Sequence, residues 1–354
     1  MTEAPAVLPQ PLLARRLGRA VELVWALTPF VTALLVGAII LWATGRNAVD
    51  TYRLLVRYSF GDRDAIAATL AATTPVLLTG LATAFAFRAG VFNVGVEGSL
   101  YFGAFAAAWV GFTYTHVAGI PLMTAALALA AGAGALGALL PALLKVLWSV
   151  DEVVTTLMFN FIAIGFTSYL VNGPFLAEGT ANSMSPLVAD QAGLPSLSPP
   201  SQMSPGILIA LGAAIAFWFV FARTTFGYEL RTVGGNRRFA LASGISVRRA
   251  VMIAMLVSGL IGGVAGGIQI LAVNHRFIDH FSPGYGFTGI AVALLGRNTA
   301  VGCVLAALFF GALANGGATI QFFTNVPIEL IQILQGTVMV FAVVQLGRGI
   351  ARRS

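Results

Sequence analysis

The chain has 354 residues, of which 58% are hydrophobic and only 9% are charged. An ordinary soluble domain carries about 25% charged residues, so the polar side chains here are too few to cover a soluble core of this size. The composition excludes a cytosolic globular protein, a disordered chain and a nucleic-acid-binding module, in spite of a formal net charge of +7. It indicates a chain that has lipid as its solvent.

Ten apolar segments are predicted as membrane-spanning helices, each of which needs about 20 residues. Their runs are continuous, which favours helices over the short alternating strands of a membrane barrel, because a helix satisfies its own backbone polar groups in lipid. We therefore predict an all-α polytopic membrane protein with about ten transmembrane helices. The segments are 24–44, 66–87, 91–112, 120–147, 153–171, 206–222, 251–273, 285–296, 301–323 and 327–346.

The basic residues predict how these helices are oriented. With the N-terminus in the cytoplasm, 15 of the 20 bases fall on the cytoplasmic side and 5 fall outside, as the positive-inside rule requires. Both termini are then cytoplasmic, as a segment over residues 1–23 and a tail over residues 348–354. Residues 24–347 form a single membrane domain.

The third segment places two polar residues, Asn93 and Glu97, in an apolar stretch beside several glycines. If the segment is helical, they share a face at positions i and i+4. An acid within a span is costly, so it usually faces the bundle interior or a water-filled path. Two compatible interpretations stay open. Glu97 lines a translocation pathway with Asn93, and it also pairs with Arg88 or caps backbone amides near a broken helix, or it has one of these roles alone.

The fifth segment begins with Asp151 and Glu152, two acids that complement the positive end of a helix dipole and are typical caps. Asn160 lies further in and is the third candidate for the pathway. A hydrogen bond between helices is its simpler interpretation, and a contact with a ligand is the alternative.

Two loops differ from the rest. Residues 172–205, predicted outside, contain six prolines and no base, so they form either a disordered lid or a docking surface for an external partner. Residues 223–250, predicted inside, carry six arginines against Glu229 alone. There Asn236 as N-cap and Gly244 past the end bracket a short helix over residues 237–243. Such a loop suits anionic lipid, and its helix also suits a groove on another protein.

The eighth segment has only 12 residues, so it is a re-entrant or broken helix unless residues from Ile278 onward extend it. Its glycine-rich start resembles that of the third segment, at the corresponding point of two five-span halves, which is typical of transporters built from repeats. Just before it, Arg276 and Asp279 are spaced to pair. His275 and His280 have no further ligand nearby, so we predict no metal site there.

Two residue types limit the chemistry. Lys145 is the only lysine and lies between Leu144 and Val146, so the chain has no Gly-Lys-Ser/Thr loop to hold ATP phosphates. Cys303 is the only cysteine, which excludes an internal disulfide. Without a nucleophile–base pair, the sequence gives little support for a membrane enzyme.

Four runs together resemble one family. They are FNVGVEGS from Phe92, DEVVTTLMFN from Asp151, TFGYELRTVGGN from Thr225 and PGYGFTGIAVALLG from Pro283. Between about Leu70 and Val340 the chain resembles the membrane permeases of bacterial ABC importers for nucleosides and simple sugars, a group that includes the ribose and branched-chain amino-acid permeases. The first run is most similar to the nucleoside-type members, although Ser99 stands where relatives commonly have Gln.

The resemblance implies a multi-pass subunit of the bacterial inner membrane that is not itself an enzyme and binds no cofactor or nucleic acid. It implies a second permease, like or unlike this one, and a separate cytoplasmic ATPase that holds ATP and Mg. A periplasmic or lipid-anchored substrate-binding protein would dock outside, with the loop 172–205 as the candidate surface. The loop 223–250 would couple to the ATPase through Gly234, Asn236, Arg237, Arg238, Phe239, Ala240 and Gly244.

The hypothesis that follows is ATP-driven import of a small polar solute, a nucleoside or related base, by alternating access. One alternative is the same machinery for a simple sugar such as ribose. Another is a secondary transporter coupled to an ion gradient, for which Glu97 is nearly the only candidate titratable group.

Overall fold

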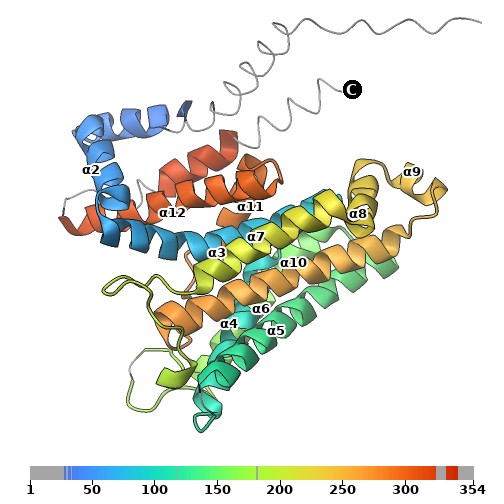
Figure 1. Cartoon of the computed structure of the whole chain (residues 1–354), viewed down its shortest axis with the longest axis horizontal. Helices are drawn as coiled ribbons and strands as arrows, with labels where there is room; N and C mark the ends of the chain where they lie inside the picture. Colours follow the sequence, from blue (N-terminus) through green and yellow to red (C-terminus); the bar gives the residue numbers. More distant parts are fainter. Residues whose placement is uncertain are drawn as a thin grey trace, which may run out of the picture.

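The apolar segments fold into long helices that lie side by side and run between two ends of the molecule (Figure 1). The computed structural model describes residues 28, 31–32, 34–117, 119–180, 182–323 and 332–341. Within these residues the structure has helices and an isolated bridge between Met184 and Ile278, and no strand. The prediction of an all-α chain is confirmed.

The helices between residues 63 and 323 follow the predicted segments closely, with short additional helices between them. They are α3 (Arg63–Arg88), α4 (Val96–Thr113), α5 (Gly119–Trp148), α6 (Glu152–Asn172), a 3-10 turn (Asp190–Ala192), α7 (Gly206–Arg223), α8 (Thr225–Gly235), α9 (Arg237–Ala242), α10 (Val247–Gln269) with its π-helical end (Ile270–Asn274), α11 (Tyr285–Leu295) and α12 (Ala300–Phe323). An amphipathic helix that was not predicted, α2 (Ala48–Phe60), precedes them and is capped by the side chain of Asn47.

Six helices of the described residues are long and apolar enough to cross a membrane: α3, α5, α6, α7, α10 with its π-helical end, and α12. The described parts of the first and last predicted segments are shorter apolar helices, Leu34–Ala43 and Gln332–Phe341. The predicted cytoplasmic segments, residues 1–23 and 348–354, lie outside the described residues. A polytopic membrane protein is therefore confirmed, while the count of ten spans stays a prediction.

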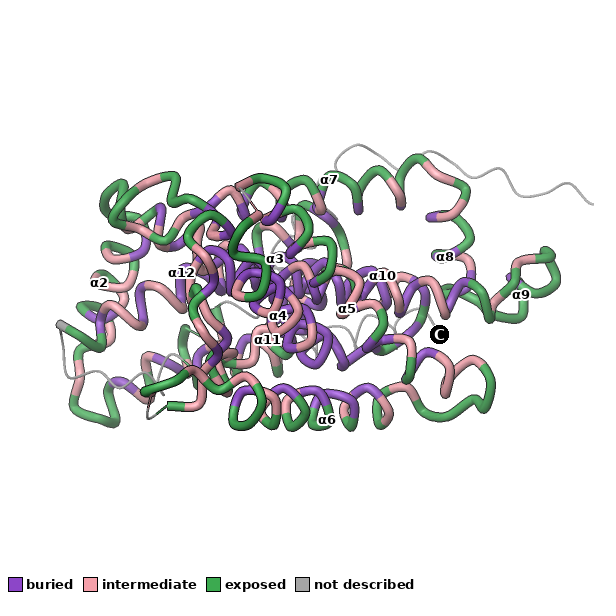
Figure 2. The backbone as a smooth tube through the Cα atoms, turned by 90° about the horizontal axis from the view of Figure 1, so that it is seen from below, coloured by how far each residue is buried: buried purple, intermediate pink, exposed green. Residues whose placement is uncertain are grey.

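Helix α10 packs between α5 and α4 through glycines. A Cβ on Gly103 of α4 would lie 2.4 Å from the Gly263 Cα of α10, and a Cβ on Gly134 of α5 would lie 2.7 Å from the same atom. Small residues permit this approach in lipid, where van der Waals packing replaces the hydrophobic effect between helices. Helix α6 lies at the edge, buried toward α4 and exposed on its outer side (Figure 2).

The long loop between α6 and α7 is held in place at one end of the bundle. Backbone amides of Ser185 and Val188 donate to the carbonyls of Phe277 and His275, and that of Ala189 donates to Gly111. These bonds contradict a disordered lid for the described residues of the loop. A docking surface stays a prediction.

The bases of the described residues divide between the two ends. Nine lie in or next to α8 and α9, at the helix ends on that side, or beside the Arg88–Asn298 contact, and the other five lie on or just before α2, at the start of α3 or before α11. The end that carries α8 and α9 is on the right in Figure 1. The nine are Arg88, Lys145, Arg223, Arg231, Arg237, Arg238, Arg248, Arg249 and Arg297. The segregation that the sequence predicted is thus present in the fold, and we call this end the basic end.

Candidate functional site

A non-helical segment, residues 90–95, connects α3 to α4, and we call it the α3–α4 linker. The prediction that Asn93 lies on a helix with Glu97 is wrong, because α4 begins only at Val96. The Asn93 side chain accepts a hydrogen bond from the Gly95 amide (2.8 Å), a local turn that competes with helix formation. Gly90 has φ +71, which also ends regular structure after α3.

The linker is fixed by buried side chains of two other helices. The Asn93 amide donates to the Ser258 hydroxyl of α10 (2.9 Å). From α6, Asn160 donates to the Val94 carbonyl (3.0 Å) and accepts from the Gly98 amide (2.8 Å). These bonds place Asn160 as a tie between α6 and the start of α4, which agrees with the simpler of its two interpretations.

Glu97, in the first turn of α4, reaches across to the start of α11. Its carboxylate accepts a hydrogen bond from the Gly286 amide and lies against the Ser282 hydroxyl. The side chain is almost fully buried. Capping of backbone amides near a broken helix is therefore the interpretation that the structure supports.

Pairing of Glu97 with Arg88 is wrong. Arg88 instead donates from Nε to the Asn298 carbonyl (2.7 Å) and lies over the Phe221 ring, 5.3 Å from its centroid. Because α4 starts only after the linker, the whole non-helical segment 90–95 lies between Arg88 and Glu97.

The starts of α4 and α11 meet deep inside the bundle. The Tyr285 carbonyl at the start of α11 accepts a hydrogen bond from Thr79 (2.9 Å), which lies nine residues, or about 14 Å, before the end of α3. With 11 residues, α11 is about 16 Å long, too short to cross a hydrocarbon core of about 30 Å. Short helices that start within the bundle are typical of transporter cores.

Residues 276–280, which precede α11, make contacts with α6 and with the loop 172–205. Asp279 accepts from the Ser168 hydroxyl (2.9 Å) and lies 3.0 Å from the His280 Nδ1. Arg276 points to the Met184 sulfur (2.8 Å), so the predicted pair between Arg276 and Asp279 is wrong. The described residues contain no group of three or more His, Cys, Asp or Glu side chains that could hold a metal ion.

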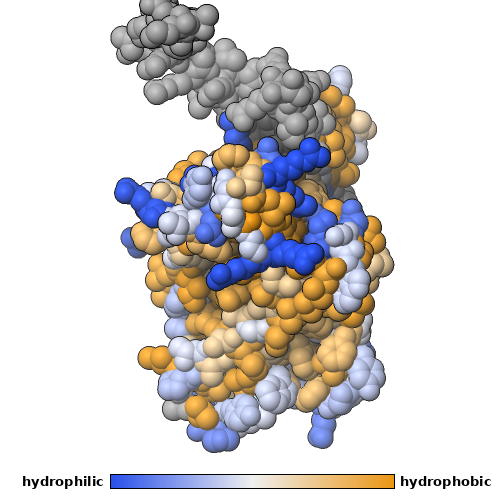
Figure 3. Space-filling model, turned by 90° about the vertical axis from the view of Figure 1, so that its right-hand side faces the viewer, coloured by the Kyte–Doolittle hydropathy of each residue, from blue (hydrophilic) through white to orange (hydrophobic). Residues whose placement is uncertain are grey.

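The basic end carries the predicted short helix. Asn236 caps α9 by accepting from the Phe239 amide (3.0 Å), and Gly244 follows with φ +76, as predicted. The helix itself is one residue shorter than the predicted range 237–243, because Ser243 is its C-cap. Ala240 is buried, while Phe239 (56% exposed) and Leu241 (62%) face outward. Figure 3, which looks onto this end, shows hydrophilic side chains projecting around hydrophobic surface.

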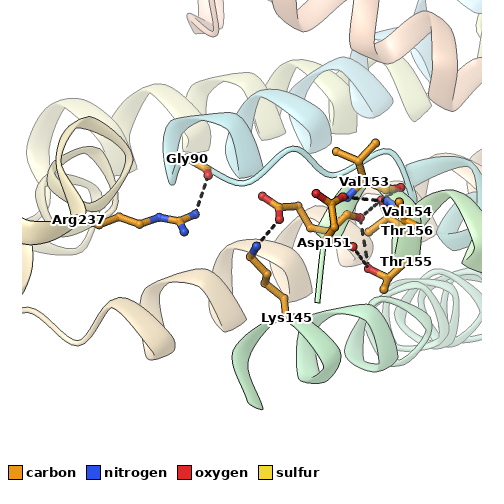
Figure 4. Close-up of polar contacts among 9 residues, drawn as sticks. Gly90, Lys145, Asp151, Val153, Val154, Thr155, Thr156 and Arg237 are labelled. Atoms are coloured by element: carbon orange, nitrogen blue, oxygen red, sulfur yellow. Dashed lines mark hydrogen bonds and ion pairs between the residues drawn. The ribbon is translucent and has the colours of Figure 1, made fainter. Parts of the chain in front are cut away.

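Three contacts lie close together at the basic end (Figure 4): one joins α9 to the linker, one joins α5 to α6, and one caps α6. The Arg237 guanidinium donates to the Gly90 carbonyl (3.1 Å). Lys145 of α5 forms an ion pair with Glu152 at the start of α6. The Asp151 carboxylate caps α6 by accepting from the Val153 amide (2.9 Å), so the prediction of a cap is confirmed for Asp151, whereas Glu152 bonds to Lys145 instead.

Several members of this constellation were missed in the sequence. They are Thr156, which accepts from the Val94 amide (3.1 Å), and Ser258, Ser282 and Gly286. Thr156 and Ser258 lie within predicted spans, so a polar side chain in an apolar run was the signal available. For Gly286 the acceptor is a side chain 189 positions away, and no local pattern indicates such a partner.

Comparisons with known proteins indicate the family of the chain. The sequence model described as "Branched-chain amino acid transport system / permease component" matches residues 65–343. The guanosine ABC transporter permease protein NupP of Bacillus subtilis (strain 168) is 37% identical over 332 residues, which cover 91% of this chain and 93% of the relative. No solved structure matches the chain.

Two further relatives have different named substrates. The glucose ABC transporter permease protein TsgB13 of Haloferax volcanii is 36% identical over 332 residues, covering 89% of this chain and 86% of the relative. The nucleoside ABC transporter permease protein NupB of Lactococcus lactis is 29% identical over 330 residues, covering 90% of each chain.

The fold and the comparisons together define a multi-pass membrane subunit of an ABC transporter, which in bacteria lies in the inner membrane. The chain belongs to the family of branched-chain amino-acid-type transport-system permeases. The resemblance that the four sequence runs carried is therefore confirmed.

Proposed function

We propose that this chain is the translocation subunit of an ATP-driven importer that moves a nucleoside or related base by alternating access. The observation that carries the proposal is the likeness to the guanosine permease, at 37% identity over nine-tenths of both chains. The buried meeting of α4 and α11 supports the transport role, since short helices that start at such a point accompany substrate sites in other transporters.

The partners follow from the same likeness. Bacillus subtilis and Lactococcus lactis each have two permeases named for the same transport, NupP with NupQ and NupB with NupC. This supports an unlike second permease. In the proposal the basic end faces the cytoplasm and meets the ATPase, which holds ATP and Mg, and the loop 172–205 faces the substrate-binding protein.

A simple sugar is the second candidate substrate, because the Haloferax glucose permease is almost as similar as the guanosine permease. The ion-coupled alternative has less support, since the Glu97 carboxylate is engaged with the start of α11. Glu97, Asn93 and Asn160 enter the proposal as residues that fix the core of the pathway.

The test is uptake by proteoliposomes that contain this chain, its partner permease, the ATPase and the substrate-binding protein. We expect ATP-dependent uptake of radiolabelled guanosine that excess unlabelled nucleosides suppress and excess glucose or ribose does not. Suppression by the sugars alone would contradict the nucleoside assignment. Uptake by the permeases alone under an ion gradient, without ATP, would contradict the ABC mechanism.

A further inference from the structure

The α3–α4 linker connects the basic end to the buried polar contacts. It starts at Gly90, beside α8 and α9, and its last residue, Gly95, lies two positions before Glu97. The linker can carry a displacement from one end to the other only if both of its ends are held. Contacts with other helices hold the linker at both ends.

At its first residue the linker is in direct backbone contact with α8. A Cβ on Gly234 would lie 2.3 Å from the Arg88 carbonyl oxygen and 2.9 Å from the Gly90 nitrogen. Conversely, a Cβ on Gly90 would lie 2.9 Å from the Gly234 Cα. Real Cβ atoms do not approach backbone this closely, so glycine at both positions is what permits the contact.

Helix α9 holds the same residue by a side chain. The Arg237 guanidinium donates to the Gly90 carbonyl (3.1 Å), and Arg237 is the first residue of α9, next to its cap Asn236 (Figure 4). Gly90 therefore contacts both helices: Gly234 near the end of α8 and Arg237 at the start of α9. If the two helices move together, Gly90 moves with them.

At its far end the linker is bonded to three other helices. Val94 is held by Asn160 of α6, Asn93 by Ser258 of α10, and Glu97 holds Gly286 at the start of α11. A displacement of Gly90 along the linker therefore acts on these buried hydrogen bonds, and they either shift together or break.

We propose that the Gly90–Gly234 contact, together with the Arg237 hydrogen bond, is the joint through which movement of α8 and α9 reaches the α3–α4 linker and the contact between Glu97 and Gly286. The inference rests on the proposed function, because it needs a partner ATPase that moves α8 and α9. Gly90, Gly234 and Arg237 are positioning residues in it and do not contact the substrate.

The neighbouring glycines of α8 supply a matched pair of variants. Gly234→Ala places a methyl group against the Arg88 carbonyl, whereas the same change at Gly235 meets nothing within 4 Å. In the complete reconstituted transporter we expect Gly234→Ala to lower ATP-driven uptake by about tenfold, and Gly235→Ala to stay within about twofold of the unmodified chain. Equal uptake by the two variants overturns the inference.

A second pair avoids the risk that Gly234→Ala disturbs folding. Arg237→Ala removes the hydrogen bond to Gly90. Arg248→Ala removes the same charge from the first turn of α10, where the exposed side chain makes no hydrogen bond or ion pair with the described residues. We expect lower uptake for Arg237→Ala, with ATPase binding and hydrolysis retained in both variants. Equal uptake in this pair also counts against the joint.

A conformational readout separates the joint from a merely structural role. Phe92 is 41% exposed and lies in the linker, so Phe92→Cys in a Cys303→Ala background gives a single reactive thiol. We expect its rate of modification to change when ATP is added, to keep changing with Gly235→Ala, and to stop changing with Gly234→Ala. A Gly234→Ala chain that keeps the ATP-dependent change overturns the inference alone, whereas an unmodified chain without ATP-driven uptake overturns the proposed function.

Discussion

Glu97 shows how a carboxylate can be accommodated within an apolar bundle. Its acceptor oxygen faces the amide of Gly286 in the first turn of α11, where the helix dipole is positive and backbone amides have no partner within the helix. The start of a helix takes the place of a basic counter-ion. The nearest arginine in the sequence, Arg88, is used elsewhere, so the acid stabilises a junction between two helix starts.

This role predicts different results for two substitutions of Glu97. Glu97→Gln keeps an oxygen that accepts from the Gly286 amide, so we expect ATP-driven uptake within about threefold of the unmodified chain. Glu97→Ala leaves that buried amide unpaired, and we expect uptake to fall by more than about tenfold. Initial uptake rates in proteoliposomes measure both. Equal loss in the two variants would instead indicate a required titratable proton at this position.

Asn160 and its neighbour Phe161 give a stability prediction. Asn160→Ala removes the partners of the Val94 carbonyl and the Gly98 amide, which are buried, and we expect a loss of about 1–3 kcal/mol. Phe161 is 63% exposed on the outer face of α6, so Phe161→Ala is the control with the smaller effect. Thermal unfolding in detergent compares the two, and a lower midpoint for the Phe161 variant than for the Asn160 variant refutes the assignment.

At the scale of elements, hydrophobic length predicts where most helices lie but not where two of them start. Residues 91–95 are as apolar as the helix that follows, and the local turn of Asn93 with Gly95 keeps them out of the helix. Helix α2 was missed because Asp50, Arg53 and Arg57 interrupt its apolar residues, although Asn47 is an evident cap. The contact between Glu97 and Gly286 joins segments 189 positions apart, and periodicity carries no information about such pairs.

A substitution on the exposed face of α9 is expected to remove binding of the ATPase without disturbing the fold. Phe239 is exposed at the basic end, while Phe60 is exposed (44%) on α2, away from that end. We expect Phe239→Asp to abolish co-purification of the ATPase and Phe60→Asp to leave it unchanged, with both chains inserted normally. Retention of the ATPase by Phe239→Asp would show that α9 is not its docking element.

At the scale of the whole molecule, the distribution of charge and the fold agree independently. The rule on basic residues uses the sequence alone, yet most of the nine bases that it assigns to one side also lie on α8 and α9 or at neighbouring helix ends. The contacts of Arg237 with Gly90 and of Arg88 with Asn298 bring together segments that are far apart in the chain.

This agreement makes the orientation a sharp prediction. Because the chain has one cysteine, and it is buried, single cysteines introduced in a Cys303→Ala background report on one side each. We expect Glu178→Cys, in the loop 172–205, to react with a membrane-impermeant thiol reagent in right-side-out spheroplasts, and Arg238→Cys to react only in inverted vesicles. Both positions are exposed, so a failure to react reflects the side of the membrane and not burial. The reverse pattern would place the basic end outside, where it could not meet a cytoplasmic ATPase, and would overturn the proposed coupling along with the orientation.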